Sequence, residues 1–167
     1  MLSQLMSQTP PWVFAVFIML LVLGLLQSKP RTVAVKTVLI LPLAMLLFSL
    51  FGVYSAFQLS FSTIGGWGIG FALALWGGLK LAQPKQVRFS VQDNQFTIPG
   101  SWTPLALMMA IFMTKFFVGF AIARHLSIID QQSFRMAVAV LYGAFSGIFV
   151  ARGLVMYQAR LTPVSAL

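Results

Sequence analysis

The chain has 167 residues, of which 59% are hydrophobic and 8% charged, so it has too little polar surface to cover a soluble globule of this size. It contains 11 Lys and Arg against two acidic residues, and its lack of cysteine excludes disulfides, thiolate metal sites and a cysteine nucleophile. Most of the basic residues lie in short loops beside apolar segments, so we expect lipid headgroups, and no nucleic acid, as their anionic neighbours. The composition therefore predicts a single transmembrane domain over residues 1–167, built from helices that pair their own backbone groups.

The first predicted helix covers residues 11–27, with Thr9 as its expected cap and Trp12 as an anchor at the outer interface. At ~1.5 Å per residue it reaches ~26 Å, just enough to cross a bilayer core. Residues 1–10 contain no Lys or Arg, so we expect no cleaved signal peptide. A second helix is predicted over residues 33–57, and a short polar loop then returns the chain to a third.

The third predicted helix covers residues 64–82, and the pattern changes after it. Over residues 86–98 apolar and polar residues alternate on both sides of a polar turn, which predicts a small β-hairpin. Its apolar face would lie on the membrane surface or cap the bundle, because an isolated hairpin is marginal in water. Ser101 can cap a fourth helix over residues 102–123, and a fifth is predicted over 134–157. The expected fold is an all-α membrane protein, a five-helix transmembrane bundle with a hairpin between its third and fourth helices.

The orientation follows from the side on which basic residues gather, because short cytoplasmic loops retain Lys and Arg. With the N-terminus outside, the hairpin and the C-terminus are cytoplasmic, and only Arg124 and Arg135 lie in outer loops. The inner side then holds a larger basic set: Lys29, Arg31, Lys36, Lys80, Lys85, Arg88, Arg152 and Arg160. Anionic headgroups on the cytoplasmic side are the partners that this distribution predicts.

Two predicted helices carry a stripe of small residues at a spacing of four. The third helix has Gly66, Gly70, Ala74 and Gly78, and the fifth has Ala139, Gly143, Gly147 and Ala151. Such stripes allow two helices in lipid to approach closely. Two interpretations fit: packing of the third helix against the fifth within one chain, or association with a second copy or another membrane protein.

Lys115 lies ~20 Å along the fourth predicted helix, in the outer half of the bilayer. A charge at such a depth costs roughly 2.5 to 3.5 kcal/mol on insertion scales. Two interpretations again stay open: a site for an anion, a headgroup or a proton, or a side chain that extends to the interface or donates to carbonyl groups. Asp130 is the acidic residue on the same side, and we expect it to pair with Lys115 or Arg124.

Three further residues draw attention inside or beside the predicted helices. Arg152 lies in the inner turns of the fifth helix, where it either extends to the interface or faces an inner vestibule. Tyr142, the lone histidine His125 and the methionines are the basis of a weaker hypothesis, a membrane enzyme or redox subunit. The sequence contains no paired carboxylates, no phosphate loop and no zinc spacing, so we expect no enzyme, no cofactor and no bound metal.

Three boundary motifs resemble those of an uncharacterised family of small five-helix bacterial inner-membrane proteins. They are Pro11-Trp12-Val13, Gln27-Ser28-Lys29-Pro30-Arg31 and Pro99-Gly100-Ser101-Trp102. The resemblance implies a multi-pass location in the bacterial inner membrane and no established activity. The sequence then favours a non-enzymatic bundle that binds lipid, a partner or itself, with a small transporter or channel for an anionic or amphipathic solute as the alternative, using Lys115.

Overall fold

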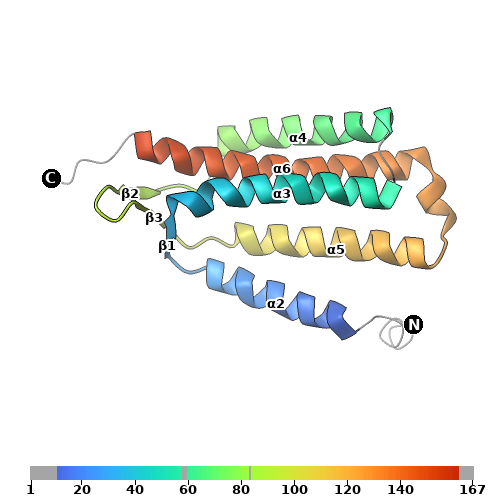
Figure 1. Cartoon of the computed structure of the whole chain (residues 1–167), viewed down its shortest axis with the longest axis horizontal. Helices are drawn as coiled ribbons and strands as arrows, with labels where there is room; N and C mark the ends of the chain where they lie inside the picture. Colours follow the sequence, from blue (N-terminus) through green and yellow to red (C-terminus); the bar gives the residue numbers. More distant parts are fainter. Residues whose placement is uncertain (1–10, 58–59, 83, 162–167) are drawn as a thin grey trace.

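The computed structural model describes residues 11–57, 60–82 and 84–161. The chain is mostly helical over these residues (Figure 1), and its elements follow in this order: α2 (Pro11–Gln27), β1 (Arg31–Ala34), α3 (Val35–Phe57), α4 (Phe61–Leu81), β2 (Arg88–Ser90), β3 (Gln95–Ile98), α5 (Thr103–Ala123), the 3-10 turn η1 (Ser127–Asp130) and α6 (Gln132–Leu161). Among the described helices, α3, α4, α5 and α6 are long and apolar enough to cross a membrane, and α2 is a shorter apolar helix. The expected cap Thr9 and the side chain of Trp12 lie outside the described part of the chain.

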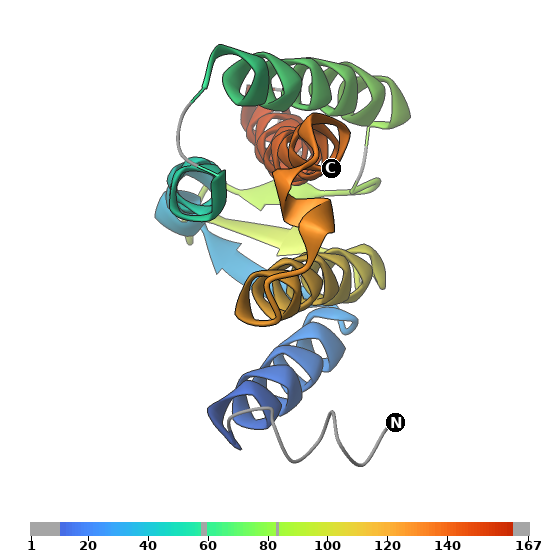
Figure 2. The ribbon, with the colours of Figure 1, turned by 90° about the vertical axis from the view of Figure 1, so that its right-hand side faces the viewer.

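The helices form two groups. Helix α6 packs most extensively against α4 and then against α3, while α2 packs against α5. Figure 2 shows these helices end-on as successive layers, from α4 through α6 and α3 to α5 and finally α2. Helices α4 and α6 run in the same direction, as expected for segments separated by one complete return of the chain (Figure 1).

A three-stranded sheet replaces the predicted two-stranded hairpin. Strands β2 and β3 form the predicted pair, and β1 adds to the free edge of β3, which gives the order β1-β3-β2 with antiparallel neighbours. The predicted start of the second helix at residue 33 is therefore wrong, because Val33 and Ala34 pair with Phe96 and Gln95. The backbone of this segment bonds to a strand some sixty positions later, which no local pattern indicates.

The apolar face of the sheet packs on protein. Phe96 is fully buried, and it lies with Ile98 against Val35 and Val38 at the start of α3. Met156, near the end of α6, packs against this cluster. The sheet therefore caps one end of the helical bundle.

The start of α4 and the length of α6 also differ from the prediction. Helix α4 begins three residues early, at Phe61, since Ser60 and Thr63 form a reciprocal capping box. Helix α6 runs over 30 residues, about 45 Å at ~1.5 Å per residue, against the predicted 134–157. Its final turns extend past the other helices and contact the sheet (Figure 1).

Candidate functional site

The two stripes of small residues face each other between α4 and α6. A Cβ atom at Gly70 would overlap the carbonyl group of Val140, and one at Gly143 would overlap the carbonyl group of Trp67. Farther along, a Cβ atom at Gly78 would lie 2.6 Å from that of Ala151. The stripes thus bring the two backbones into direct contact. This contact holds the polar groups beside it in position.

Beside this interface, three helices are joined by hydrogen bonds at the centre of the bundle. The indole Nε1 of Trp67 in α4 donates to Oγ of Ser49 in α3 at 2.7 Å, and that hydroxyl donates to the carbonyl oxygen of Tyr142 in α6 at 2.9 Å. Both groups lie among apolar side chains, where an unpaired donor is costly. Sequence reasoning missed Ser49 and Trp67, although a hydroxyl in the middle of an apolar helix was a signal.

Lys115 points into the bundle from α5. Its Nζ lies 4.2 Å from the ring centroid of Phe48 and 5.2 Å from that of Tyr142, both within the range of a cation–π contact. The space for this amine exists because residue 52 is glycine: a Cβ atom there would lie 3.1 Å from Nζ. The structure therefore brings two of the predicted residues, Lys115 and Tyr142, together at one point.

A small cavity of about 20 Å³ adjoins this contact, and Lys115, Tyr142 and Ser146 line it. The Oγ of Ser146 is buried and accepts or donates no hydrogen bond among the described residues. A cavity of this size holds about one water molecule, which would give Ser146 a partner. The lysine thus borders a small space inside the bundle, next to the hydroxyl-bearing residue Ser146.

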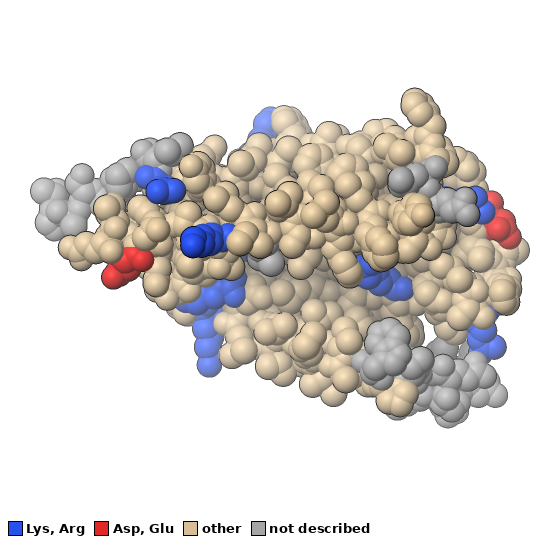
Figure 3. All heavy atoms as spheres, viewed as in Figure 1, with Lys and Arg blue, Asp and Glu red and all other residues tan. Residues whose placement is uncertain are grey.

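On its other side, Lys115 borders a much larger groove between the two groups of helices. The groove has a volume of about 620 Å³, and residues of α2, α3, α5 and α6 line it. Its walls are apolar, among them Leu20, Phe112 and Phe120, and Lys115 is the charged residue in the lining. Figure 3 shows the molecule hollowed along this line, between α3 and α5.

Arg152 lies at the other end of the bundle, in a pocket of about 280 Å³ beside the sheet. Arg31 of β1 lines the same pocket, and its Nη2 donates to Oε1 of Gln27 at 2.9 Å. Burial lowers the pKa of Arg31, but a guanidinium stays charged at neutral pH. Sequence reasoning singled out Arg152 and missed Arg31, whose position depends on the pairing of β1 with β3.

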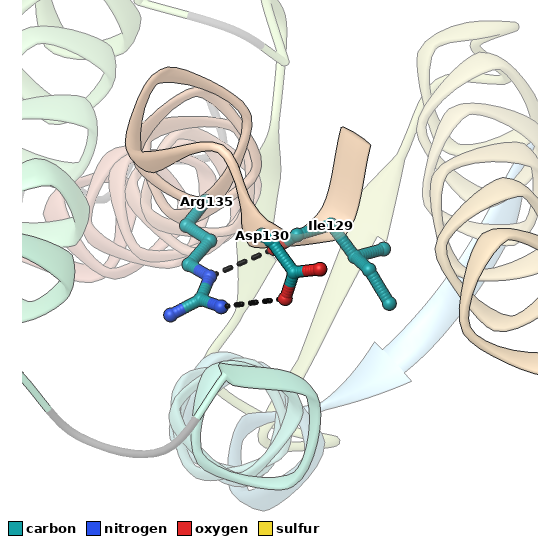
Figure 4. Close-up of polar contacts among 3 residues, drawn as sticks. All are labelled: Ile129, Asp130 and Arg135. Atoms are coloured by element: carbon teal, nitrogen blue, oxygen red, sulfur yellow. Dashed lines mark hydrogen bonds and ion pairs between the residues drawn. The ribbon is translucent and has the colours of Figure 1, made fainter. Parts of the chain in front are cut away.

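The prediction that Asp130 pairs with Lys115 or Arg124 was wrong. Its carboxylate pairs with Arg135, at 3.3 Å from Nη2, and Nε of Arg135 donates to the carbonyl oxygen of Ile129 at 2.8 Å (Figure 4). The turn η1 places Asp130 five residues before Arg135, so a local pair forms and the longer reach to Lys115 or Arg124 is not made. Asp130 therefore belongs to a surface turn, away from the amine of Lys115.

The comparisons with known proteins identify a family and no function. No curated protein and no solved structure matches the chain. A family model described as a family of unknown function (DUF6622) matches residues 1–162. The chain therefore belongs to DUF6622, a family of unknown function.

Proposed function

We propose that the protein is a multi-pass protein of the bacterial inner membrane, with its N-terminus outside and its C-terminus in the cytoplasm. The apolar helices support membrane insertion, as do large side chains that are more than half exposed, such as Ile40, Phe51 and Leu73. Figure 3 supports the orientation, because most basic side chains in that view gather at the end that holds the sheet. Positive charge of this kind favours the cytoplasmic face.

Within the membrane, we propose that the protein acts without catalysis, by holding a lipid or another amphiphile in the groove between its two groups of helices. The observation that carries this proposal is the groove itself: about 620 Å³ of apolar space with one amine in its lining. A lipid chain would complete the packing that α2 and α5 leave open against α3 and α6. Lys115 would attract a negative or polar group on the same molecule.

Gly119 offers a direct test. It lines the groove, and a Cβ atom there would meet no other atom within 4 Å, so Gly119→Trp should fold normally and fill the groove. Gly68→Trp is the matched control, because Gly68 is equally open and lies on α4, which does not line the groove.

The measurement is native mass spectrometry of protein extracted gently from its own membrane. We expect Gly119→Trp to retain less lipid than the wild type and Gly68→Trp. Equal retention in all three would remove the groove as the binding site. The same spectrum detects a second copy or another membrane protein, which we expect on other faces, because the α4–α6 stripes are already buried against each other.

A second candidate function is transport of an anionic or amphipathic solute, and the inward position of Lys115 favours it. The amine contacts aromatic rings on two other helices, and Lys115 lines both the groove and the small cavity beside Ser146. Lys115→Met should then abolish flux of such a solute in proteoliposomes while the protein still folds. Unchanged flux in that variant would remove the proposed role of the lysine.

A further inference from the structure

The two arginines beside the sheet pair with no carboxylate among the described residues. The whole chain has two acidic side chains, Asp93 and Asp130. Asp93 accepts a hydrogen bond from Ser90 in the exposed turn after β2, and Asp130 pairs with Arg135. Neither lines the pocket that Arg31 and Arg152 share.

One donor of Arg152 has no partner among the described residues. Its Nη1 is buried from solvent and makes no hydrogen bond there. A charged donor in an apolar setting is costly to leave without an acceptor. The charge of Arg31 also acts on Arg152, so the two cations repel each other in the absence of an anion.

The rest of the pocket suits a small anionic group with an apolar part behind it. Gln27 holds the guanidinium of Arg31 through a side-chain hydrogen bond, and Thr37 also lines the pocket. Phe149 and Met156 form apolar walls, and the volume of about 280 Å³ exceeds what one ordered water needs. Phe149 also lines the large groove, so the two spaces are neighbours.

We propose that Arg31 and Arg152 form a binding site for a phosphate group, carried either by a lipid headgroup or by a free anion. Guanidinium groups bind phosphate oxygens through paired, charge-assisted hydrogen bonds, and they keep their charge at every physiological pH. The site lies where α2 ends and the sheet begins, which is the level of the headgroups in the proposed orientation. Its lining shares only Phe149 with the groove.

The test uses the full-length protein, stripped of lipid in a neutral maltoside detergent, with two pairs of probes. Phosphatidic acid and diacylglycerol with the same acyl chains differ only in the phosphate, and their retention is compared by native mass spectrometry. Inorganic phosphate is titrated in a thermal-shift assay with chloride as its control. The variants are Arg31→Gln and Arg152→Gln, with Arg160→Gln as the control, an exposed arginine on the same helix as Arg152.

We expect each of the two variants to retain at least about tenfold less phosphatidic acid than the wild type, from the loss of a charge-assisted contact. Retention of diacylglycerol, and all binding by Arg160→Gln, should not change. Thermal stabilisation by inorganic phosphate that depends on both arginines, without selective retention of phosphatidic acid, would assign the site to a free anion. Binding of neither phosphate probe, or equal binding by wild type and both variants, would overturn the proposal.

Two features keep the test informative. Arg31 lies on a strand and Arg152 on a helix, so if one variant fails to fold, the other still tests the site. Removing the unpaired buried charge of Arg152 should not unfold the protein. Gly119→Trp fills the groove and leaves this pocket open. A groove proposal that fails therefore shows as unchanged lipid binding in Gly119→Trp. The phosphate proposal fails instead when neither phosphate probe binds, or when the wild type and the arginine variants bind equally.

Discussion

The α4–α6 interface and the α2–α5 pair show two ways in which apolar helices meet. Between α4 and α6, small residues let one backbone touch the other, so that a Cβ atom at Gly143 or Gly147 would meet backbone atoms of α4. Helices α2 and α5 meet through mixed contacts: the ring centroids of Phe17 and Phe112 lie 5.3 Å apart, and a Cβ atom at Gly24 would lie 3.0 Å from the Cα atom of Leu105. Close approach fills the space between α4 and α6, whereas a groove remains where α2 and α5 face α3 and α6.

This contrast separates scaffold from site. The α4–α6 contact gives α6 a fixed position, and the polar groups of α3, α5 and α6 are arranged around it. The groove lies where α2 and α5 face this unit, and residues of α2, α3, α5 and α6 line it. Because α2 and α5 pack less extensively on this unit than α3 and α4 do, we expect motion mainly in α2 and α5. Variants in the two regions test this division.

The largest effect is expected for Gly143→Leu. The new side chain must displace the carbonyl group of Trp67, which belongs to the backbone of α4 and cannot turn away. We expect a loss of about 3 kcal/mol or more in the free energy of unfolding, measured by titration with a denaturing detergent. Gly65→Leu is the control, since nothing lies within 4 Å of a Cβ atom there. Similar losses in both would mean that helix packing does not distinguish these positions.

A smaller loss should follow Ser49→Ala. This change removes the acceptor of the Trp67 indole and the donor to the carbonyl of Tyr142, leaving a buried N–H without its partner. We expect a cost of about 1 to 3 kcal/mol in the same titration. Ser55→Ala, which removes only a bond to the nearby carbonyl of Gly52, should cost less. Trp67→Phe combined with Ser49→Ala should recover part of the loss, and failure to do so would argue against the network.

Lys115→Met should act in the opposite direction. An amine in the bundle has a cost of insertion, and its contacts with Phe48 and Tyr142 offset only part of it. We expect the free energy of unfolding to rise by about 1 kcal/mol, because methionine fills the same space without a charge. A clear decrease in stability would show that the lysine has a structural role, and the proposal that it serves a ligand would lose its basis.

The smallest effect is expected at the turn η1. Asp130 is exposed, so Asp130→Asn should change the free energy of unfolding by less than about 0.5 kcal/mol. Arg135→Gln should cost somewhat more, because it also removes the donor to the carbonyl of Ile129. Differential scanning fluorimetry of both variants against the wild type measures this order. A reversed order would mean that Asp130 has a partner beyond its own turn.

Elements with local signals could be predicted from the amino-acid sequence. Long apolar runs placed the helices, alternation placed β2 and β3, and the spacing of four identified the faces that α4 and α6 use, because hydropathy and helix periodicity belong to neighbouring residues. It also singled out Lys115 and Arg152, since a charge in an apolar run is costly wherever the run folds.

Contacts between residues far apart in the chain could be known only from the way in which the elements pack. Four such features link different elements: the pairing of β1 with β3, the hydrogen bond from Trp67 to Ser49, the ring contacts of Lys115, and the pocket that joins Arg31 to Arg152. The partner of Asp130 was decided by a short turn that brings Arg135 within reach. Hydropathy says which segments avoid water, but side-chain contacts depend on how those segments rotate and pack, and nearby apolar helices can pack in many ways at similar free energy.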